Sequence, residues 1–509
     1  MSRSQYNLRA RLRVGVVAVG FAVATVFGAG EAEAQVRPDR LTLEEAIELA
    51  RRNNPTFLST QNDRGVAAWG ERAAYGAFLP TVNASGSAGW TEAGAQRIGT
   101  LDFGDQGTDW YSSSYALGLT WTLNGNTIFG VSNARSTRRA TNARVDAAQF
   151  SLDSQVALQY MSVLRASDQV DVAQRQLDRA QQNLRIVNTR VSSGAAAGTE
   201  GQQAQVDLGR AEVGLIQAER DLRQAKHLLA EQIGVELEPD VVLESEFEVF
   251  EPDFDPDEMI RLAVSDHPSL NAFRAQESAQ RAAARQTATS QYLPTVTVQT
   301  GFRGNTLQAL NEEFLLTQEG NRITSQRESC EFQNAINSGL TSPLPGYPRD
   351  CSQFVMTDDR RQQLIQSNDV FPFNFTTLPL SLSLQVSLPI FTGFSRQQQV
   401  AQANAMADDA EHDRRAEELR LRTAVTTAVD NLTSAHRVLQ AEERNRALAE
   451  EQLQMQQRRY ALGAAAMLEL LDAQTTMTTA DQAYLNALYD FHYSLIALEA
   501  AVGRPLRSR

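Results

Sequence analysis

The sequence predicts a mixed α and β fold that combines long coiled-coil helices with a few β-strands and repeats one plan twice. Three observations lead to this prediction. Short motifs recur in the same order in two halves of the chain. Apolar residues keep a heptad spacing over stretches longer than an ordinary globular helix. Between the helical stretches, apolar and polar residues alternate with the period of a β-strand.

The N-terminal segment has the pattern of a signal peptide. Four arginines precede an apolar run over 14–29, and Ala32-Glu33-Ala34 fits the small-residue pattern before a cleavage site. The run is too short and too rich in Gly and Ala to predict a membrane-spanning helix. We therefore predict a signal peptide over 1–34 and an exported protein, the alternative being an uncleaved amphipathic N-terminus.

Composition and motif content argue against several classes of function. The formal net charge is −14 at pH 7, so the chain lacks the cationic character that nucleic-acid binding requires. No nucleophile motif, phosphate loop or zinc signature is present, and we predict no enzyme activity and no cofactor. Asp408 and His412 lie one helical turn apart and could ligate a metal, but we prefer a solvated helix face and predict no metal site.

Two copies of one plan divide the exported chain. The motif Leu-Pro-Thr-Val at 79–82 recurs at 293–296. The stretch RVSSGAAA at 190–197 aligns with RYALGAAA at 459–466. We therefore predict an internal tandem duplication. The first copy spans 35–250 and the second spans 251–509.

Each copy begins with a helix and continues with two strands. Apolar residues over 43–50 recur at helical spacing, and the Leu-Pro-Thr-Val motif then ends the helix and begins a strand. In the second strands, over 114–123 and 378–388, apolar residues alternate with small polar ones. Such a strand suits a barrel wall between lipid and water. A half-buried strand of a soluble β-sandwich shows the same alternation.

Long helices follow the second strand of each copy. In the first copy the heptad positions carry Val163, Ala166, Val170, Ala173, Leu177, Ala180, Leu184, Val187 and Val191. The second copy keeps the spacing more weakly. Helices this long and this polar have no core of their own, so we expect them to pack laterally as a left-handed coiled coil. Gly194 and Gly463 interrupt the heptads, so each is predicted to turn one helix back into an antiparallel partner.

Two strands per copy give four strands per chain. A membrane barrel needs at least about eight strands, and open strand edges cannot face lipid because their backbone groups would go unsatisfied. A transmembrane β-barrel would therefore have to be shared between chains. The strand count alone leaves two chains and three chains open.

Two motifs of the second copy resemble the TolC-like outer-membrane efflux proteins. They are Leu-Pro-Ile-Phe-Thr-Gly at 388–393 and Arg459-Tyr460 with Gly463, followed by Glu-Leu-Leu-Asp-Ala-Gln at 469–474. The resemblance covers about 41–503. It implies a homotrimer whose β-barrel lies in the cell outer membrane and whose α-helical barrel extends into the periplasm. It also implies a channel for efflux or type I secretion that docks to a periplasmic adaptor and an inner-membrane pump of RND or ABC type.

The resemblance, together with the small residues at the two helical turns, points to these turns as the place where the adaptor docks. The predicted docking residues are Ser193, Gly194 and Ala195 in the first turn and Leu462, Gly463 and Ala464 in the second. Turns that bind no partner are the alternative. For the whole molecule, the alternative function is a periplasmic or surface coiled-coil scaffold or adhesin without a pore.

Acidic residues beyond the second turn are candidates for a periplasmic gate. Glu469 and Asp472 lie three residues apart and share a helix face. The resemblance implies that these two positions ring the periplasmic entrance, with Glu200 as the equivalent of Glu469 in the first copy. The alternative is that they are solvated residues on the outer wall.

The second copy carries an insertion between its two strands, at about 302–376. We predict that it forms an extracellular loop. It holds the two cysteines of the chain, Cys330 and Cys351, and export to an oxidising compartment permits them to pair. We therefore predict a disulfide that closes this loop.

Overall fold

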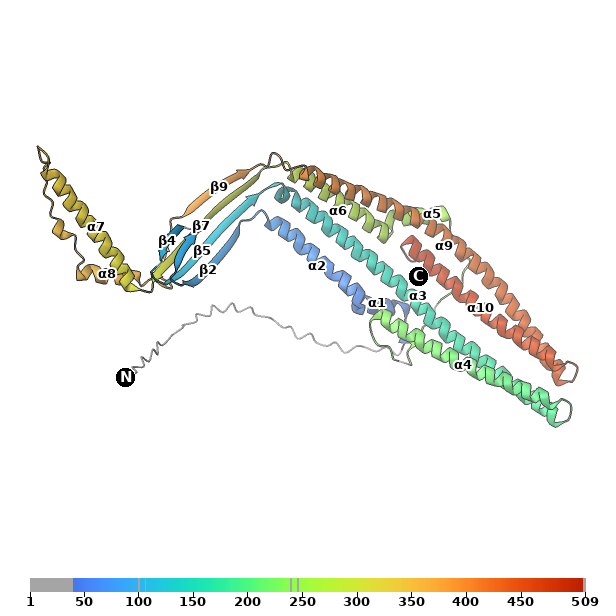
Figure 1. Ribbon diagram of the computed structural model, residues 1–509. Coiled ribbons are helices and arrows are strands. Elements are labelled where there is room, and N and C mark those ends of the chain that lie inside the picture. Colours follow the sequence, from blue (N-terminus) through green and yellow to red (C-terminus); the bar gives the residue numbers. More distant parts are fainter. Residues whose placement is uncertain (1–39, 99–100, 106, 239, 245–246, 507–509) are drawn as a thin grey trace, which may run out of the picture.

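The computed structural model describes residues 40–98, 101–105, 107–238, 240–244 and 247–506. The predicted signal peptide over 1–34 lies outside them. The described chain is elongated, with a β-sheet between a long array of helices and a separate helical hairpin (Figure 1). None of the described helices is both long and apolar enough to cross a membrane.

The same order of main elements, two helices, two strands of the central sheet and two long helices, occurs twice along the chain. The first half contains β1 (Arg40–Leu41), α1 (Leu43–Asn53), α2 (Pro55–Gly76), β2 (Thr81–Thr91), β3 (Ala95–Ile98), β4 (Leu101–Asp105), β5 (Trp110–Leu123), α3 (Gly125–Ser192), α4 (Gly198–Ile233) and β6 (Val242–Leu243). The second half contains α5 (Pro256–Asp266), α6 (Pro268–Ser290), β7 (Thr295–Ala309), α7 (Glu312–Ser338), the 3-10 turn η1 (Cys351–Gln353), α8 (Asp358–Asn368), β8 (Thr376–Thr377), β9 (Ser381–Ser387), α9 (Ser395–Ala461) and α10 (Met467–Val502).

Local sequence explains where the short helices begin. Thr42 begins α1 with a capping box, in which its hydroxyl and the carboxylate three residues later each accept a backbone N–H. Asn54 caps α2, and Pro55 follows in the first turn of the helix. A backbone N–H at this position has no acceptor within the helix, so proline, which lacks the N–H, costs no hydrogen bond. The second half repeats this cap-and-proline pattern at 255–256 and 267–268.

The central sheet is antiparallel in the order β2-β5-β7-β9, and β8 also pairs with β7. The strands expected from the alternating sequence are therefore present. In the described part of the chain, β2 pairs only with β5 and β9 pairs only with β7, so the sheet has two open edges. β3 and β4 form a separate hairpin that the sequence pattern did not predict.

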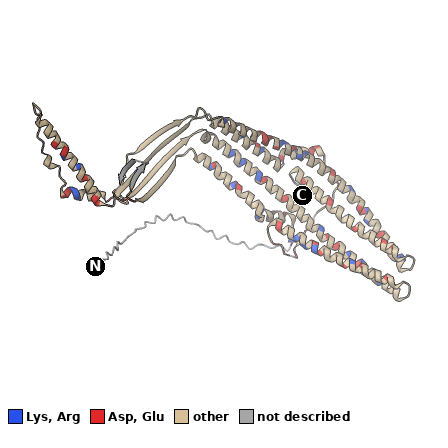
Figure 2. Cartoon of the chain, viewed as in Figure 1, with Lys and Arg blue, Asp and Glu red and all other residues tan. Residues whose placement is uncertain are grey.

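The two faces of the sheet differ in polarity. The register places Leu117 opposite Phe302 and Val298 opposite Leu384, so apolar residues of neighbouring strands share one face. This face is uncovered in the single chain, with Phe302 50 % and Leu384 68 % exposed. Small polar residues occupy the other face, where Gln385 lies opposite a threonine. The sheet is almost free of charged residues, whereas charges line the helices (Figure 2).

The two longest helices, α3 with 68 residues and α9 with 67, extend away from the sheet (Figure 1). At 1.5 Å per residue each is about 100 Å long. α3 returns through α4 and α9 through α10, as the glycine interruptions predicted, while α6 packs against both α3 and α9. Buried residues form three separate apolar clusters along these helices instead of one core.

The insertion projects from the end of the sheet opposite the long helices (Figure 1). Its predicted start at about 302 falls inside β7, which runs to Ala309 because its backbone pairing with β5 continues to that residue. Beyond it, α7 and α8 form a hairpin in which Arg360 contacts Glu319 at 3.1 Å. Cys330 and Cys351 are joined by a disulfide, with their Cα atoms 5.8 Å apart.

Candidate functional site at the paired helical turns

The turns at the far ends of α3 and α9 have the same backbone structure. Gly194 has a φ of 76° and Gly463 a φ of 77°, in the left-handed region that favours glycine. The N–H of Ala195 donates to the carbonyl of Arg190, and the N–H of the residue after Gly463 makes the equivalent bond, both at 2.8 Å. The sequence repeat at the turns is therefore also a structural repeat.

One arginine in each copy fastens its own turn. Arg190 donates from Nη2 to the carbonyl of Ala195 at 3.1 Å, and Arg459 donates from Nη2 to the carbonyl of Ala464 at 3.3 Å. The accepting carbonyl groups belong to residues of the turns, between the helices, and these bonds give them a partner within the chain. Each turn is thus held in one conformation by a residue of the helix that leads into it.

Tyr460 joins the two turns. Its side chain is 1 % exposed, and its hydroxyl donates to Oε2 of Glu200 at 2.6 Å. Arg190 donates to the Tyr460 carbonyl at 2.6 Å, and its guanidinium lies 4.1 Å from the centre of the tyrosine ring. Burial and the Glu200 carboxylate together raise the pKa of Tyr460 to about 12. A tyrosine hydroxyl is already protonated at neutral pH, and the shift extends the pH range over which it donates to Glu200.

The three acidic residues predicted for a gate have different surroundings. Glu469 lies in the first turn of α10, is exposed, and contacts Arg459 at 3.5 Å. Asp472 is also exposed. Glu200 is half-buried, because its carboxylate faces Tyr460 of the other copy. In the single chain, Glu469 and Asp472 are thus accessible to solvent, whereas Glu200 accepts a hydrogen bond from Tyr460 between the two turns.

The residues predicted to dock an adaptor all lie on the surface of the turns. They are Ser193, Gly194, Ala195, Leu462, Gly463 and Ala464, and every one of them is exposed. Leu462 is 84 % exposed, and Leu468 nearby is 77 % exposed. The two turns therefore present small residues together with uncovered leucine side chains.

A buried ion cluster between the two copies was not predicted from the sequence. The Asp481 side chain is 1 % exposed and accepts from Arg179 of α3 and Arg446 of α9, each at 2.9 Å. The sequence did hold a signal for it, because Asp481 is the one charged residue between Asp472 and Asp490. A single carboxylate in an otherwise uncharged stretch needs a charged partner when the stretch is buried, because an unpaired charge is unfavourable away from water.

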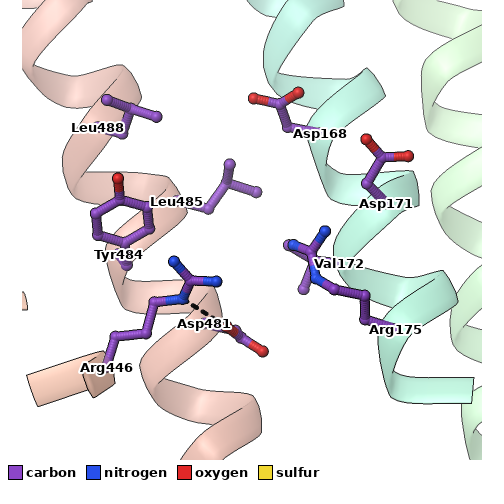
Figure 3. A pocket seen from close by; sticks show the side chains of 9 residues that line it. All are labelled: Asp168, Asp171, Val172, Arg175, Arg446, Asp481, Tyr484, Leu485 and Leu488. Carbon is purple, nitrogen blue, oxygen red and sulfur yellow. Dashed lines mark hydrogen bonds and ion pairs between the residues drawn. The ribbon is translucent and has the colours of Figure 1, made fainter. Parts of the chain in front are cut away.

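A cavity of about 220 Å³ lies beside this cluster, between α3 and α10 (Figure 3). Its lining includes Asp168, Asp171, Arg175 and Tyr484. The hydroxyl of Tyr489 donates to Asp168 at 2.7 Å. Burial raises the pKa of Asp168 above its usual range, although this hydrogen bond opposes the shift. Val172, Leu485 and Leu488 also line the cavity, so the boundary between the copies is of mixed polarity and incompletely filled at this point.

A family model described as outer membrane efflux protein matches residues 46–235 and 356–504, which together make up more than half of the chain. The chain belongs to the outer membrane efflux protein family. The resemblance inferred from the sequence motifs is therefore confirmed. As a member of this family the protein is an efflux channel of the outer membrane that extends into the periplasm, and the family is one of transport proteins, not of enzymes.

Solved structures share the fold of this outer membrane efflux protein. A membrane protein from Pseudomonas aeruginosa is 18 % identical, with 91 % of this chain and 90 % of that chain covered and a TM-score of 0.65. The outer membrane protein VceC from Vibrio cholerae is 16 % identical, with 91 % and 97 % covered and a TM-score of 0.64. The MtrE outer membrane channel of Neisseria gonorrhoeae, in its open state, is 18 % identical, with 91 % and 89 % covered and a TM-score of 0.62. Among curated proteins compared by sequence, none matches the chain.

These similarities confirm the predicted fold class, a mixed α and β channel fold of the TolC-like type. Among the described residues, no group of three or more His, Cys, Asp and Glu side chains is placed to hold a metal ion. Asp408 and His412, the pair weighed as metal ligands, are exposed on α9.

Proposed function

We propose that three copies of this outer membrane efflux protein form one conduit through the outer membrane and the periplasm. The observation that carries the proposal is the central sheet, whose apolar face is uncovered and whose edge strands β2 and β9 each lack a second neighbour in the described chain. An apolar face suits lipid, and open edges in lipid require pairing with further strands. In the proposed assembly, β9 of one copy pairs with β2 of the next.

Closure of the sheet fixes a minimum number of copies. A membrane barrel needs at least about eight strands, and one chain supplies only four main strands in its described part. Two or three chains satisfy this minimum, and resemblance to the TolC-like family favours three. The same rotation that closes the sheet would place the α3–α4 and α9–α10 hairpins side by side around one axis.

The turns of the two hairpins are the proposed contact with a periplasmic adaptor. Their small exposed residues permit the close approach of another helical protein, and Leu462 and Leu468 offer apolar surface at the same end. Through the adaptor the conduit would connect to an inner-membrane pump of RND or ABC type. Efflux and type I secretion both fit such a conduit, because the pump selects the cargo.

The acidic residues near the turns are the proposed gate. Glu469 and Asp472 would face the entrance, where three copies gather their carboxylates and raise the local cation concentration. The hydrogen bond between Tyr460 and Glu200 would hold the two hairpins of each copy together while the entrance is narrow.

Two arginine substitutions on neighbouring residues of β9 test the proposed barrel. Leu384→Arg places a charge on the proposed lipid face, at a penalty of about 2–4 kcal/mol near the bilayer midplane. Gln385→Arg places the same charge on the opposite face. We expect Leu384→Arg to reduce the amount of protein in the outer membrane, and Gln385→Arg to insert normally and change single-channel conductance in planar bilayers. A scaffold without a pore would give no conductance in the unaltered protein and would tolerate both substitutions.

A further inference from the structure

The insertion of the second copy ends in a segment without charged residues. Residues 332–348 contain no Asp, Glu, Lys or Arg, whereas charged residues occur in the chain on both sides of this segment. Four of its large apolar side chains are between 43 % and 66 % exposed. We call the surface that they form the insertion tip, and its residues are Phe332, Ile336, Leu340 and Leu344. A group of uncovered apolar side chains on an otherwise charged hairpin indicates contact with another molecule.

The insertion tip is held in one conformation by bonds within the hairpin. The side chain of Asn334 donates to the carbonyl of Arg349 and accepts from the N–H of the same residue, both at 2.8 Å. The buried Asn337 accepts from the N–H of Leu344 at 2.8 Å, so the chain after α7 folds back against the end of that helix. The disulfide closes the same loop. A surface that is ordered before it binds loses little conformational entropy on binding.

The base of the hairpin is fixed to the central sheet. Asn368, at the end of α8, donates to the carbonyl of Ala309 at 2.8 Å and accepts from its N–H at 2.9 Å. The N–H of Phe371 donates to Gln308 at 2.8 Å, and the ring of Phe371 stacks on Tyr111 of β5 with 5.0 Å between the ring centres. These bonds attach the hairpin to β5 and β7 at the end of the sheet from which it projects (Figure 1).

The absence of charge suits contact between identical copies. In a symmetric assembly, a surface near the axis meets the same surface of the other copies. Any charge on it would face like charges, which is unfavourable by several kcal/mol. A partner of different sequence would place no such limit on the insertion tip, because it could carry the opposite charge.

The dimensions of the proposed barrel bring the hairpins within reach of one another. Twelve strands spaced by about 4.8 Å and tilted by about 40° enclose a barrel roughly 24 Å across. Three hairpins at equal intervals on its rim begin about 20 Å apart. The 27 residues of α7 span about 40 Å, so an inward lean of about 10° brings the tips to helix-packing distance.

We propose that the three insertion tips of one channel associate with one another above its extracellular mouth. The exit is then divided into three side openings between the hairpins, and their width limits the size of the molecules that pass. The contact forms after the barrel has closed, because three small tips alone bury too little surface for stable association. It is therefore needed neither for the trimer nor for ion conductance. This inference rests on the proposed trimeric conduit.

Cysteine cross-linking of the full-length protein tests the contact. Ser342 lies in the loop beside the insertion tip, and Ser325 lies midway along α7; both are exposed. In detergent-solubilised protein at high dilution, so that separate particles do not meet, oxidation of Ser342→Cys should link two of the three chains in each particle. Ser325→Cys is the matched control on the same helix and should leave the chains unlinked.

A charge on the insertion tip should separate the copies. Leu344→Glu, combined with Ser342→Cys, should reduce the linked fraction about tenfold, because three carboxylates would meet. Gln326→Glu places the same charge on an exposed position of α7 away from the tip and should leave the linked fraction unchanged. Equal linking in the two charge variants would overturn the contact.

Polymer exclusion in planar bilayers tests the size limit. A poly(ethylene glycol) that enters the mouth from the extracellular side lowers the conductance, whereas a larger one that is excluded does not. The largest polymer that lowers the conductance should be larger for Leu344→Glu than for the unaltered protein and for Gln326→Glu. The same limit in all three proteins would overturn the division of the exit.

The number of chains per particle separates this inference from the proposed function. Three chains per particle without links through Ser342→Cys would overturn the contact between tips and retain the trimeric conduit. A monomer would overturn the conduit and, with it, the contact. In isolated outer membranes, links from Ser342→Cys to a different protein, in place of links between copies, would show that the insertion tip binds another partner and would overturn its self-association.

Discussion

At the residue scale, Tyr460 and Glu200 join the two copies through one short hydrogen bond between buried or half-buried groups. Arg190 reinforces the contact from the other side, because it binds the Tyr460 carbonyl and lies against the ring. The contact lies directly beside the turns that are proposed to dock an adaptor. Any movement that separates the two turns must therefore break it.

Removal of the Tyr460 hydroxyl tests this contact. Tyr460→Phe keeps the buried ring but leaves the Glu200 carboxylate without its donor, so we expect the closed arrangement to lose about 1 kcal/mol. Single-channel recordings should then show more frequent opening. Tyr292→Phe removes a hydroxyl from an exposed tyrosine between α6 and β7 and serves as the control. Equal opening of the two variants would mean that the Tyr460 contact does not restrain the channel.

The proposed gate is tested by the double variant Glu469→Ala, Asp472→Ala. Three copies would lose six carboxylates from the entrance, so the local cation concentration should fall. We expect lower cation selectivity and weaker block by multivalent cations added from the periplasmic side. Replacement of Asp358 and Asp359 by alanine removes two exposed carboxylates from the distant α8 and provides the comparison. Unchanged selectivity and block in the first variant would place Glu469 and Asp472 on the outer wall.

At the element scale, the sequence correctly predicted those turns and strands that are determined by local residue patterns. Glycine interruptions located the turns at Gly194 and Gly463, and period-two alternation located the strands of the central sheet. Elements that depend on distant partners were missed or misplaced. β7 continues past 302, where its alternation weakens, because β5 supplies its hydrogen bonds. Contacts between the copies, such as Tyr460 with Glu200, require the packing of helices that are far apart in the sequence.

The helices of the insertion were also missed, and the reason is physical. Among the described residues of α7 only Cys330 and Asn337 are buried, so the helix has no apolar stripe for a pattern to reveal. Asn311 caps it and two glutamates occupy its first turn, which favours a helix start by local chemistry alone. Contacts with α8 and the disulfide then hold this weakly packed hairpin in place.

We therefore expect the disulfide to stabilise the α7–α8 hairpin and to have no effect on assembly or conductance of the channel. Cys330 and Cys351 are 21 residues apart, and closing a loop of that size contributes about 3 kcal/mol. In the double variant Cys330→Ser, Cys351→Ser we expect faster proteolysis between 312 and 368. Assembly and conductance should stay unchanged, since neither the central sheet nor the long helices use these residues. Loss of assembly in this variant would show that the hairpin takes part in the contact between copies.

At the scale of the whole molecule, the chain exposes more surface than a stable monomer of its size. Large apolar side chains are more than half exposed in several of its described helices, among them Trp69 of α2, Ile216 of α4 and Leu448 of α9. The uncovered leucines of β9 and the long surfaces of α3 and α9 are parts of this excess. Three small apolar clusters along the helices replace the single core of a globular domain. Such a chain needs partner surfaces to bury the rest.

This excess of exposed surface predicts that the protein folds only as an assembly of several chains. Native mass measurement of the detergent-solubilised protein should give three chains per particle and no folded monomer. Because folding and association would be one process, loss of helical circular dichroism should coincide with loss of the trimer. The midpoint of that transition should rise with protein concentration, as mass action requires for a folded state that exists only as an assembly. Gln385→Arg should keep the trimer and the concentration dependence of its transition. Leu384→Arg should shift the midpoint of that transition only in lipid, where the apolar face of β9 meets an apolar solvent. A monomer that retains full helical content, or a particle of two chains, would contradict the trimer and with it the closure of the sheet by β9 and β2 of neighbouring copies.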